Sequence, residues 1–231
     1  TAPPIVARRR FEGSDPSRLR RFPQRAWSRW LLRLAIATPF AAIAILAAQA
    51  PGFDELTTPN AALLQHLRGV DLGAGARELG ALYPPITTVA ALALAQLPFA
   101  PAALGIAGAV AAGTMLQRLA EGMRRRRHHT YKRIALIVSL VATPLFAYLV
   151  TTDLASIVGL WLFSIGMSDL VRFVAFGNTQ AGFRAGLLLA GASLSSPMGI
   201  VYVVVAVITT PLIRGSWVGN RARLSNIVVV G

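Results

Sequence analysis

The chain has 231 residues, of which 55% are hydrophobic and only 14% are charged, and its net charge is +14. A soluble domain has about 25% charged residues, so this composition predicts a membrane protein. The sequence contains no cysteine, which excludes disulfides and thiolate metal sites.

The positive charge is confined to a few segments. All lysines and arginines except Arg68 and Arg77 lie in 1–33, 118–133, 172–184 and 214–223. Basic residues on alternate connections between apolar segments are typical of cytoplasmic loops, and they also suit anionic lipid headgroups. The pattern therefore predicts anionic membrane lipids, and no nucleic acid, as partners of these segments, with the loop 51–85 outside.

The ends of the chain differ in composition from its middle. Residues 1–17 are rich in proline, arginine and serine, which predicts a disordered cytoplasmic tail. The arginines of 18–29 recur at helical spacing, so this segment is either an amphipathic helix on the inner leaflet or a charged lead-in to the first span. The missing initial methionine, and an apolar run that starts at Ile227, suggest part of a longer protein. Arginine-rich, lysine-poor usage indicates a bacterial protein, and we expect the inner membrane.

The apolar segments predict an all-α fold, a single polytopic domain over 18–231 with the N-terminus in the cytoplasm. Each segment without charge that is close to the length of a bilayer crossing is taken as a transmembrane helix. About six are expected: 34–50, 99–117, 134–150, 154–170, 185–195 and 198–213.

Two of these assignments follow from charge parity. The loop 51–85 is outside and 118–133 inside, so an odd number of crossings separates them. We therefore expect 86–97 to be an interfacial or re-entrant helix before the span 99–117. The arm 185–195 spans only about 17 Å, so it requires neighbouring helices around Ala192 and Ser193.

Three acids outside the apolar segments are candidate catalytic residues. Asp54 and Glu55 follow the first span, where a carboxylate can deprotonate a hydroxyl or bind a divalent ion. Asp153 stands alone in the turn between two apolar helices. The alternatives are a solvated loop for the acid pair and a helix N-cap for Asp153.

Other polar residues have structural interpretations. Tyr83-Pro84-Pro85 predicts an extended approach to the helix at 86–97, because each proline restricts its own φ and the preceding residue. The charges within 59–79 predict a salt-bridged surface helix. Asp169 lies three residues before Arg172, which predicts an i,i+3 ion pair.

These features together resemble the GT-C superfamily of membrane glycosyltransferases, which includes protein mannosyltransferases and aminoarabinose transferases. The resemblance covers about 34–213 and rests on four features: an acid after the first span, Tyr83-Pro84-Pro85-Ile86, the outer acid of Thr152-Asp153-Leu154, and the stretch from Gly177 to Gly191.

The resemblance implies a function and a site. The chain would transfer a sugar from a polyprenyl-phosphate donor at the outer face, with Asp54 as catalytic base, Glu55 beside it and Asp153 as second acid. Tyr83 and Thr87 are expected to line the substrate cavity, and a divalent metal ion is a possible cofactor. Two alternatives stay open: a non-catalytic scaffold subunit among further membrane subunits, and a small transporter, which the lack of a charge at mid-bilayer disfavours.

Overall fold

The computed structural model describes residues 25–49, 58–69, 83–125 and 130–212, and every regular element in these ranges is helical. The all-α prediction is confirmed for this part of the chain. The tail predicted for 1–17 lies outside it. The helices are α1 (Ala26–Ala48), α2 (Pro59–Gly69), α3 (Pro85–Ala95), α4 (Ala100–Arg125), α5 (Thr130–Val141), α6 (Pro144–Thr152), α7 (Leu154–Phe176), α8 (Thr179–Ser195), α9 (Gly199–Thr209) and the short 3-10 helix η3 (Thr210–Leu212).

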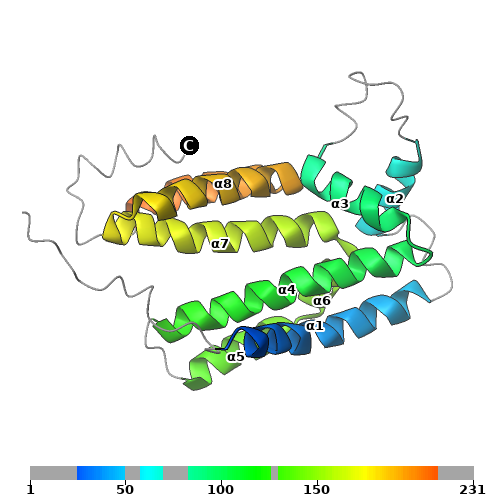
Figure 1. Ribbon diagram of the computed structural model, residues 1–231, viewed down its shortest axis with the longest axis horizontal. Coiled ribbons are helices and arrows are strands. Elements are labelled where there is room, and N and C mark those ends of the chain that lie inside the picture. Colours follow the sequence, from blue (N-terminus) through cyan, green and yellow to red (C-terminus); the bar gives the residue numbers. More distant parts are fainter. Residues whose placement is uncertain (1–24, 50–57, 70–82, 126–129, 213–231) are drawn as a thin grey trace, which may run out of the picture.

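The long helices α1, α4, α7 and α8 run along the longest axis of the molecule (Figure 1). The central helix is α4, which packs against α1, α6 and α7, while α8 packs between α7 and α9. At one end of the bundle, where α1 ends and α4 begins, lie α2 and α3 (Figure 1). We call this the loop end, and the opposite end the basic end.

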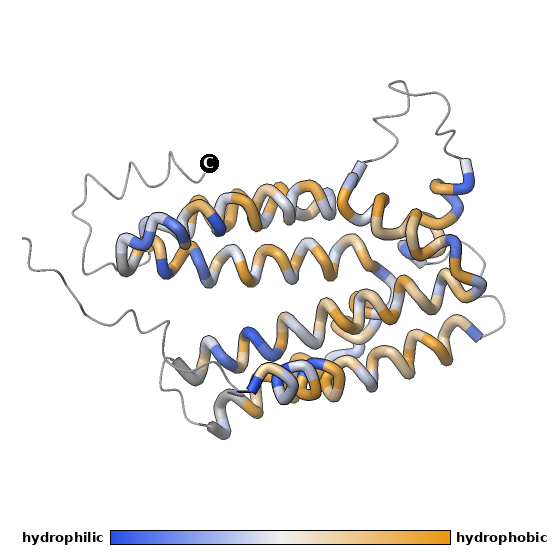
Figure 2. The backbone as a smooth tube through the Cα atoms, in the orientation of Figure 1, coloured by the Kyte–Doolittle hydropathy of each residue, from blue (hydrophilic) through white to orange (hydrophobic). Residues whose placement is uncertain are grey.

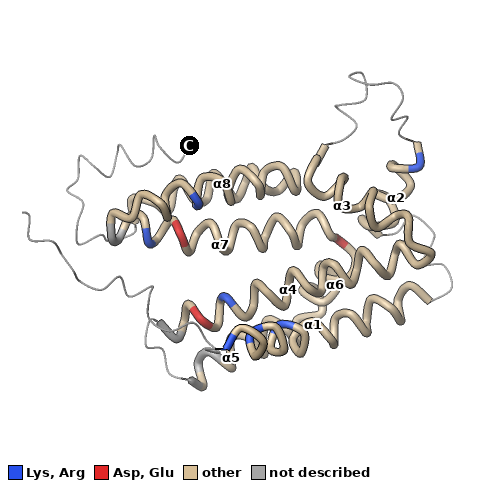
Figure 3. The backbone as a smooth tube through the Cα atoms, viewed as in Figure 1, with Lys and Arg blue, Asp and Glu red and all other residues tan. Residues whose placement is uncertain are grey.

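The distribution of polarity follows the long axis. Figure 2 shows hydrophobic residues along most of the long helices, and Figure 3 shows charged residues gathered mainly at the basic end. The loop end has Arg68, on α2, and Asp153, between α6 and α7. This arrangement is the one expected when a bundle crosses a bilayer and keeps its arginines on one side.

Two groups of buried apolar side chains hold the bundle together. One joins α1, α4, α6 and α7, where the ring of Phe40 meets that of Phe146 edge-on with centroids 5.7 Å apart. The other joins α7, α8 and α9 around Leu170, Leu189 and Ala206, which are almost inaccessible to solvent. Many outward-facing apolar side chains are exposed, as is required where lipid covers a surface.

Among the residues that the structure describes, three helices are long and apolar enough to cross a membrane, and four if a bent pair counts as one span. The three are Ala26–Ala48, Ala100–Met123 and Leu154–Val174, of 23, 24 and 21 residues. These helices match the predicted spans 34–50, 99–117 and 154–170, and each helix is longer than the span predicted for it. The structure therefore supports a membrane protein.

The predicted span 134–150 is not a single straight helix. The chain forms two helices here, Ile134–Val141 and Pro144–Thr152, bent by 66°. Pro144 has no N–H to continue the helix and restricts Thr143, which is extended at φ −75° and ψ 118°. Proline fits the first turn of a new helix instead, so α6 begins at Pro144.

The predicted arm 185–195 was too short. Helix α8 has 17 residues and begins at Thr179, after Asn178, whose Oδ1 accepts a hydrogen bond from the N–H of Ala181 at 3.1 Å. Since α7 continues to Phe176, the predicted connection 172–184 shrinks to Gly177 and Asn178. Arg184 had been taken as the end of a span because it is charged, but it lies within α8. Ala192 is buried, as that arm required, and Ser193 is partly buried.

The remaining segments follow the predicted pattern in part. A short helix, α3, does lie where 86–97 was expected, and Pro84 before it is extended at ψ 124°. Helix α9 with η3 corresponds to 198–213. The surface helix predicted over 59–79 is confirmed to Gly69, and its later residues lie outside the described part. The lead-in at 18–29 belongs to the first long helix from Ala26 onward.

Glycines on α4 allow its neighbours to approach closely. A Cβ built on Gly105 would lie 2.6 Å from that of Ala44 on α1 and 2.8 Å from the carbonyl oxygen of Thr151. A Cβ on Gly108 would collide with the carbonyl oxygen of Val150 on α6. Small residues at such contacts are the usual means by which membrane helices pack, and here they allow the last turn of α6 to lie directly against α4.

Candidate functional site

The joint between α6 and α7 lies at the loop end and is centred on Asp153. The side-chain Oδ1 of Asp153 accepts a hydrogen bond from the N–H of Ser156 at 2.9 Å, so Asp153 is the N-cap of α7. The other carboxylate oxygen, Oδ2, accepts no hydrogen bond from any residue that the structure describes. The capping role predicted as an alternative is thus confirmed, and one oxygen stays available.

A buried asparagine on α2, which was not predicted as a functional or structural residue, connects α6 to α7. Asn60 is 2% exposed. Its Oδ1 accepts a hydrogen bond from the N–H of Leu154 at 2.8 Å, and its Nδ2 donates to the carbonyl of Thr151 at 3.4 Å. One side chain therefore serves the last turn of α6 and the first turn of α7. From the sequence, an asparagine after a proline is expected to be a loop residue. The hydrogen bonds that Asn60 makes could not be predicted, because their partners lie more than 90 positions away in the sequence.

Two hydroxyl groups, at the start of helix α3 and just before it, donate hydrogen bonds to the C-terminal end of α8. Thr87 donates a hydrogen bond to the carbonyl of Ser195 at 2.9 Å, and Tyr83 donates to the carbonyl of Ser193 at 3.2 Å. The last carbonyls of a helix have no partner within it, so these bonds satisfy groups that α8 leaves open. Both residues were predicted to line a substrate cavity. Their hydroxyls position α3, and a role in substrate binding stays a prediction.

Next to this contact is a hydroxyl without a partner. Thr88 is fully buried, and its Oγ1 makes no hydrogen bond among the described residues. The carbonyl of Pro84, its usual helical acceptor, already receives the N–H of Thr88, and the hydroxyl of Thr87 lies 3.2 Å from the same oxygen. The buried surface of α3 thus carries one unused polar group.

The joint and the α3–α8 contact belong to the same end of the molecule. Tyr202, near the start of α9, stacks on Phe163 with 4.9 Å between ring centroids. Ser196, which follows α8, lies against Gly159 on α7, as does the Tyr202 ring. Asp153, Tyr83 and Thr87 therefore lie toward the same end of the bundle (Figure 1), and the cavity that they were predicted to share stays a prediction.

The other two predicted acids, Asp54 and Glu55, lie outside the described residues, so their approach to Asp153 stays a prediction. In the ranges that the structure does describe, no three histidine, aspartate or glutamate side chains are grouped so as to hold a metal ion.

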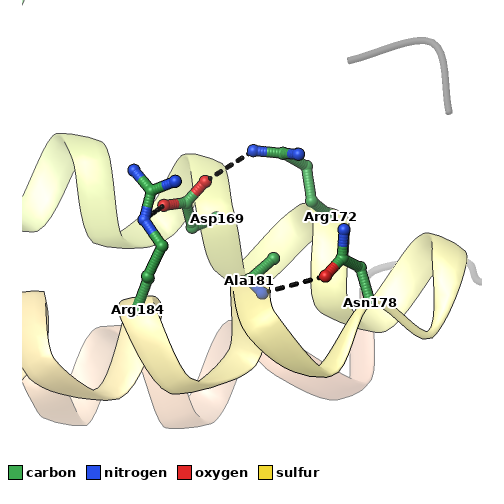
Figure 4. A network of polar contacts seen from close by, with 5 residues as sticks. All are labelled: Asp169, Arg172, Asn178, Ala181 and Arg184. Atoms are coloured by element: carbon green, nitrogen blue, oxygen red, sulfur yellow. Dashed lines mark hydrogen bonds and ion pairs between the residues drawn. The ribbon is translucent and has the colours of Figure 1, made fainter. Parts of the chain in front are cut away.

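A second polar site lies toward the basic end, between α7 and α8 (Figure 4). Asp169 is 4% exposed and accepts a hydrogen bond from Nη1 of Arg172 at 3.0 Å, which confirms the predicted i,i+3 pair. Arg184 on α8 is a further partner, with Nε 3.4 Å from Oδ2 of Asp169. This partner was not predicted, because Arg184 was expected to lie outside the helix.

A third polar group joins α1 to α4 at the basic end. Nε of Arg33 donates to Oε1 of Gln117 at 3.2 Å, and Nε2 of Gln117 donates to Oε2 of Glu121 at 3.4 Å. The Arg33 guanidinium also lies over the ring of Trp30, 4.7 Å from its centroid. Gln117 and Glu121 are buried, so this network fixes the spacing of two long helices near the membrane surface.

Comparisons of the chain with family models, with curated proteins and with solved structures found no match.

Proposed function

We propose that this chain is a six-span protein of a bacterial inner membrane that transfers a sugar from a polyprenyl-phosphate donor at the outer face. The observation that supports this best is the position of Asp153. Asp153 lies between the end of α6 and the start of α7, and neither helix has another charged residue near it. One of its carboxylate oxygens caps α7, and the other is available to a ligand. A carboxylate at the membrane surface is accessible both to the phosphate group of a lipid donor and to a water-soluble acceptor.

The proposed reaction assigns a role to each acid. Asp54 takes the proton of the acceptor hydroxyl, and the acceptor oxygen bonds to the anomeric carbon of the sugar. The bond between that carbon and the phosphate oxygen breaks, and polyprenyl phosphate leaves. Asp153, through its available oxygen, positions the phosphate or binds a divalent ion that neutralises it. Glu55 lies beside the base, and α3 forms one wall of the site.

The orientation of the bundle can be tested with cysteine labelling, because the native chain has no thiol. We expect a cysteine at Gln65, an exposed position on α2, to react with an impermeant maleimide in intact spheroplasts. A cysteine at Arg25, exposed before α1, should react only after permeabilisation. The reverse pattern would place the basic end outside and reject the proposed orientation.

The reaction itself can be tested with Asp153→Asn. Asparagine caps a helix about as well as aspartate, so this variant should fold like the native protein and lose only the charge. We expect sugar release from a panel of radiolabelled polyprenyl-phosphate sugars, in proteoliposomes of the full chain, to fall about 100-fold or more in Asp153→Asn and Asp54→Asn.

One observation favours a scaffold subunit as the second candidate: Asp153 already has a structural task as the cap of α7. A scaffold would keep its stability and its partner subunits when Asp153 becomes asparagine. Unchanged turnover in this variant, or no turnover in the native chain, would favour the scaffold over the transferase.

A further inference from the structure

The joint between α6 and α7 consists of one residue, so the position of its carboxylate depends on two helix ends. Because α6 ends at Thr152 and α7 begins at Leu154, Asp153 is the C-cap of the first helix and the N-cap of the second. The N–H of Asp153 donates to the carbonyl of Leu149 in α6 at 3.1 Å, and its own carbonyl accepts from the N–H of Ile157 in α7 at 3.2 Å. A change in the angle between these helices therefore turns the Asp153 side chain.

The hydroxyl groups in the last turn of α6 place no restraint on that angle. Oγ1 of Thr151 donates to the carbonyl of Ala147 at 2.9 Å, and Oγ1 of Thr152 donates to that of Tyr148 at 2.7 Å. Both acceptors belong to α6, so these bonds do not connect it to α7.

The amide of Asn60 supplies a restraint from outside the two helices, on both sides of Asp153. Its Oδ1 accepts from the N–H of Leu154 at 2.8 Å, and its Nδ2 donates to the carbonyl of Thr151 at 3.4 Å. The first N–H groups and the last carbonyls of helices lack partners within the helix. A carboxamide offers an acceptor and a donor side by side, whereas a carboxylate offers acceptors only. One side chain thus pairs a free donor with a free acceptor across the joint.

Apolar contacts also hold α2 in place, so the amide is not needed for packing. Leu64 and Leu67 are each 7% exposed and belong to the core shared with α1, α4, α6 and α7. They lie four and seven positions after Asn60, on the same side of the helix. An apolar residue at position 60 would continue this face, whereas a buried amide costs free energy unless its hydrogen bonds are made. The backbone groups that it serves are therefore the reason for an asparagine here.

From this combination we propose that Asn60 is a positioning residue for Asp153. By fixing the joint, the amide keeps Oδ1 of Asp153 on the N–H of Ser156, at 2.9 Å, and so sets the direction of the oxygen that is available to a ligand. In the proposed transfer reaction this oxygen positions the donor phosphate or its metal ion. The inference rests on the proposed function only for that step, because the direction of the carboxylate is a property of the joint and is tested by itself.

The test is amide hydrogen exchange of the full chain in detergent micelles, measured at two positions by NMR. The N–H of Ser156 donates to the side chain of Asp153, and that of Ile157 donates to its backbone carbonyl. Asn60→Leu keeps the shape of the side chain and removes both of its hydrogen bonds. We expect exchange at Ser156 to become about fivefold faster or more, and exchange at Ile157 to change by less than about twofold.

Two results of this measurement would overturn the proposal. Equal acceleration at Ser156 and Ile157 would mean that the first turn of α7 unfolds and that Asn60 only stabilises a helix end. Unchanged exchange at Ser156 would mean that the carboxylate keeps its direction without the amide.

The matched control is Leu67→Ala, which weakens an apolar contact on the same face of α2 and keeps the amide. Exchange at Ser156 should be as in the native chain, and an acceleration equal to that in Asn60→Leu would assign the effect to the packing of α2 and contradict the proposal. Asn60→Ser has a side chain too short for both hydrogen bonds and admits water beside the free groups. It should show the same pattern with a smaller change, and it serves as the test if Asn60→Leu does not fold.

Turnover separates this inference from the proposed function. If the native chain transfers sugar, Asn60→Leu should lower kcat about tenfold with little change in the KM for the donor. Because Asn60 acts through Asp153, adding Asn60→Leu to Asp153→Asn should cause no further loss. Losses that multiply in the double variant would reject the positioning role and leave the transferase intact. No turnover in the native chain would reject the transferase alone, and the exchange at Ser156 and Ile157 would still decide how Asn60 acts.

Discussion

Replacing Asp169 by leucine is expected to lower the free energy of unfolding by about 3 kcal/mol. Removing one partner from a buried ion pair costs about 3–5 kcal/mol, because it leaves an uncompensated charge. The lower end applies here, since the Arg184 side chain is 49% exposed and can turn toward water. Reversible unfolding of the detergent-solubilised chain by dodecyl sulfate measures the difference.

The matched variant replaces all three charged residues by leucine: Asp169→Leu, Arg172→Leu and Arg184→Leu together. An apolar group in place of a complete buried ion network is about as stable as the network itself, so this variant should recover most of the loss. If the single and triple variants unfold alike, the loss comes from leucine packing rather than from the removal of the Asp169 carboxylate from the two arginines.

Gly108→Leu is expected to separate α4 from α6 and to lower the free energy of unfolding by about 3 kcal/mol. A Cβ at this position meets the carbonyl oxygen of Val150, a backbone atom that cannot turn aside. Overpacking of a close contact costs about 1–3 kcal/mol, and the upper end applies because the backbone itself must move. The same unfolding assay gives the value.

The control is Gly122→Leu on the same helix, where a Cβ would have no atom within 4 Å outside the local helix backbone. Leucine favours a helix over glycine, so this variant should be as stable as the native chain or slightly more stable. Comparable losses in the two variants would mean that α4 is sensitive to any bulk, and that the contact with Val150 has no special importance.

The predicted elements that were confirmed are those whose signal lies in adjacent residues. Asp153 before an apolar run predicted a turn and a cap, and both are present. The proline pair at Pro84 and Pro85 predicted an extended approach to a short helix, which α3 is. In each case local chemistry decides the conformation, because a cap or a proline acts within three or four residues.

The predictions were wrong where contacts between residues far apart in the sequence determine the conformation. The charge of Arg184 predicts the end of a span, whereas Arg184 lies within α8 and pairs with Asp169 on the adjacent helix, and α8 begins six residues before the predicted start at 185. Asn60 carried no local signal, since the backbone groups it serves belong to α6 and α7. Pro144 was different: its local signal is strong, and a break should have been predicted within 134–150. The roles of Asp54 and Glu55 stay predictions.

The bend between α5 and α6 bears on the bilayer around the protein. Its two apolar arms are about 12 Å and 14 Å long at 1.5 Å per residue, and with a bend of 66° they reach only about 21 Å from end to end, compared with a hydrocarbon thickness of about 30 Å. In the proposed six-span topology this bent pair is one crossing, and a crossing this short would be matched by local thinning of the lipid. The two leaflets would therefore come closest beside α5 and α6, and that flank is where a polar headgroup has the shortest path from one side of the membrane to the other.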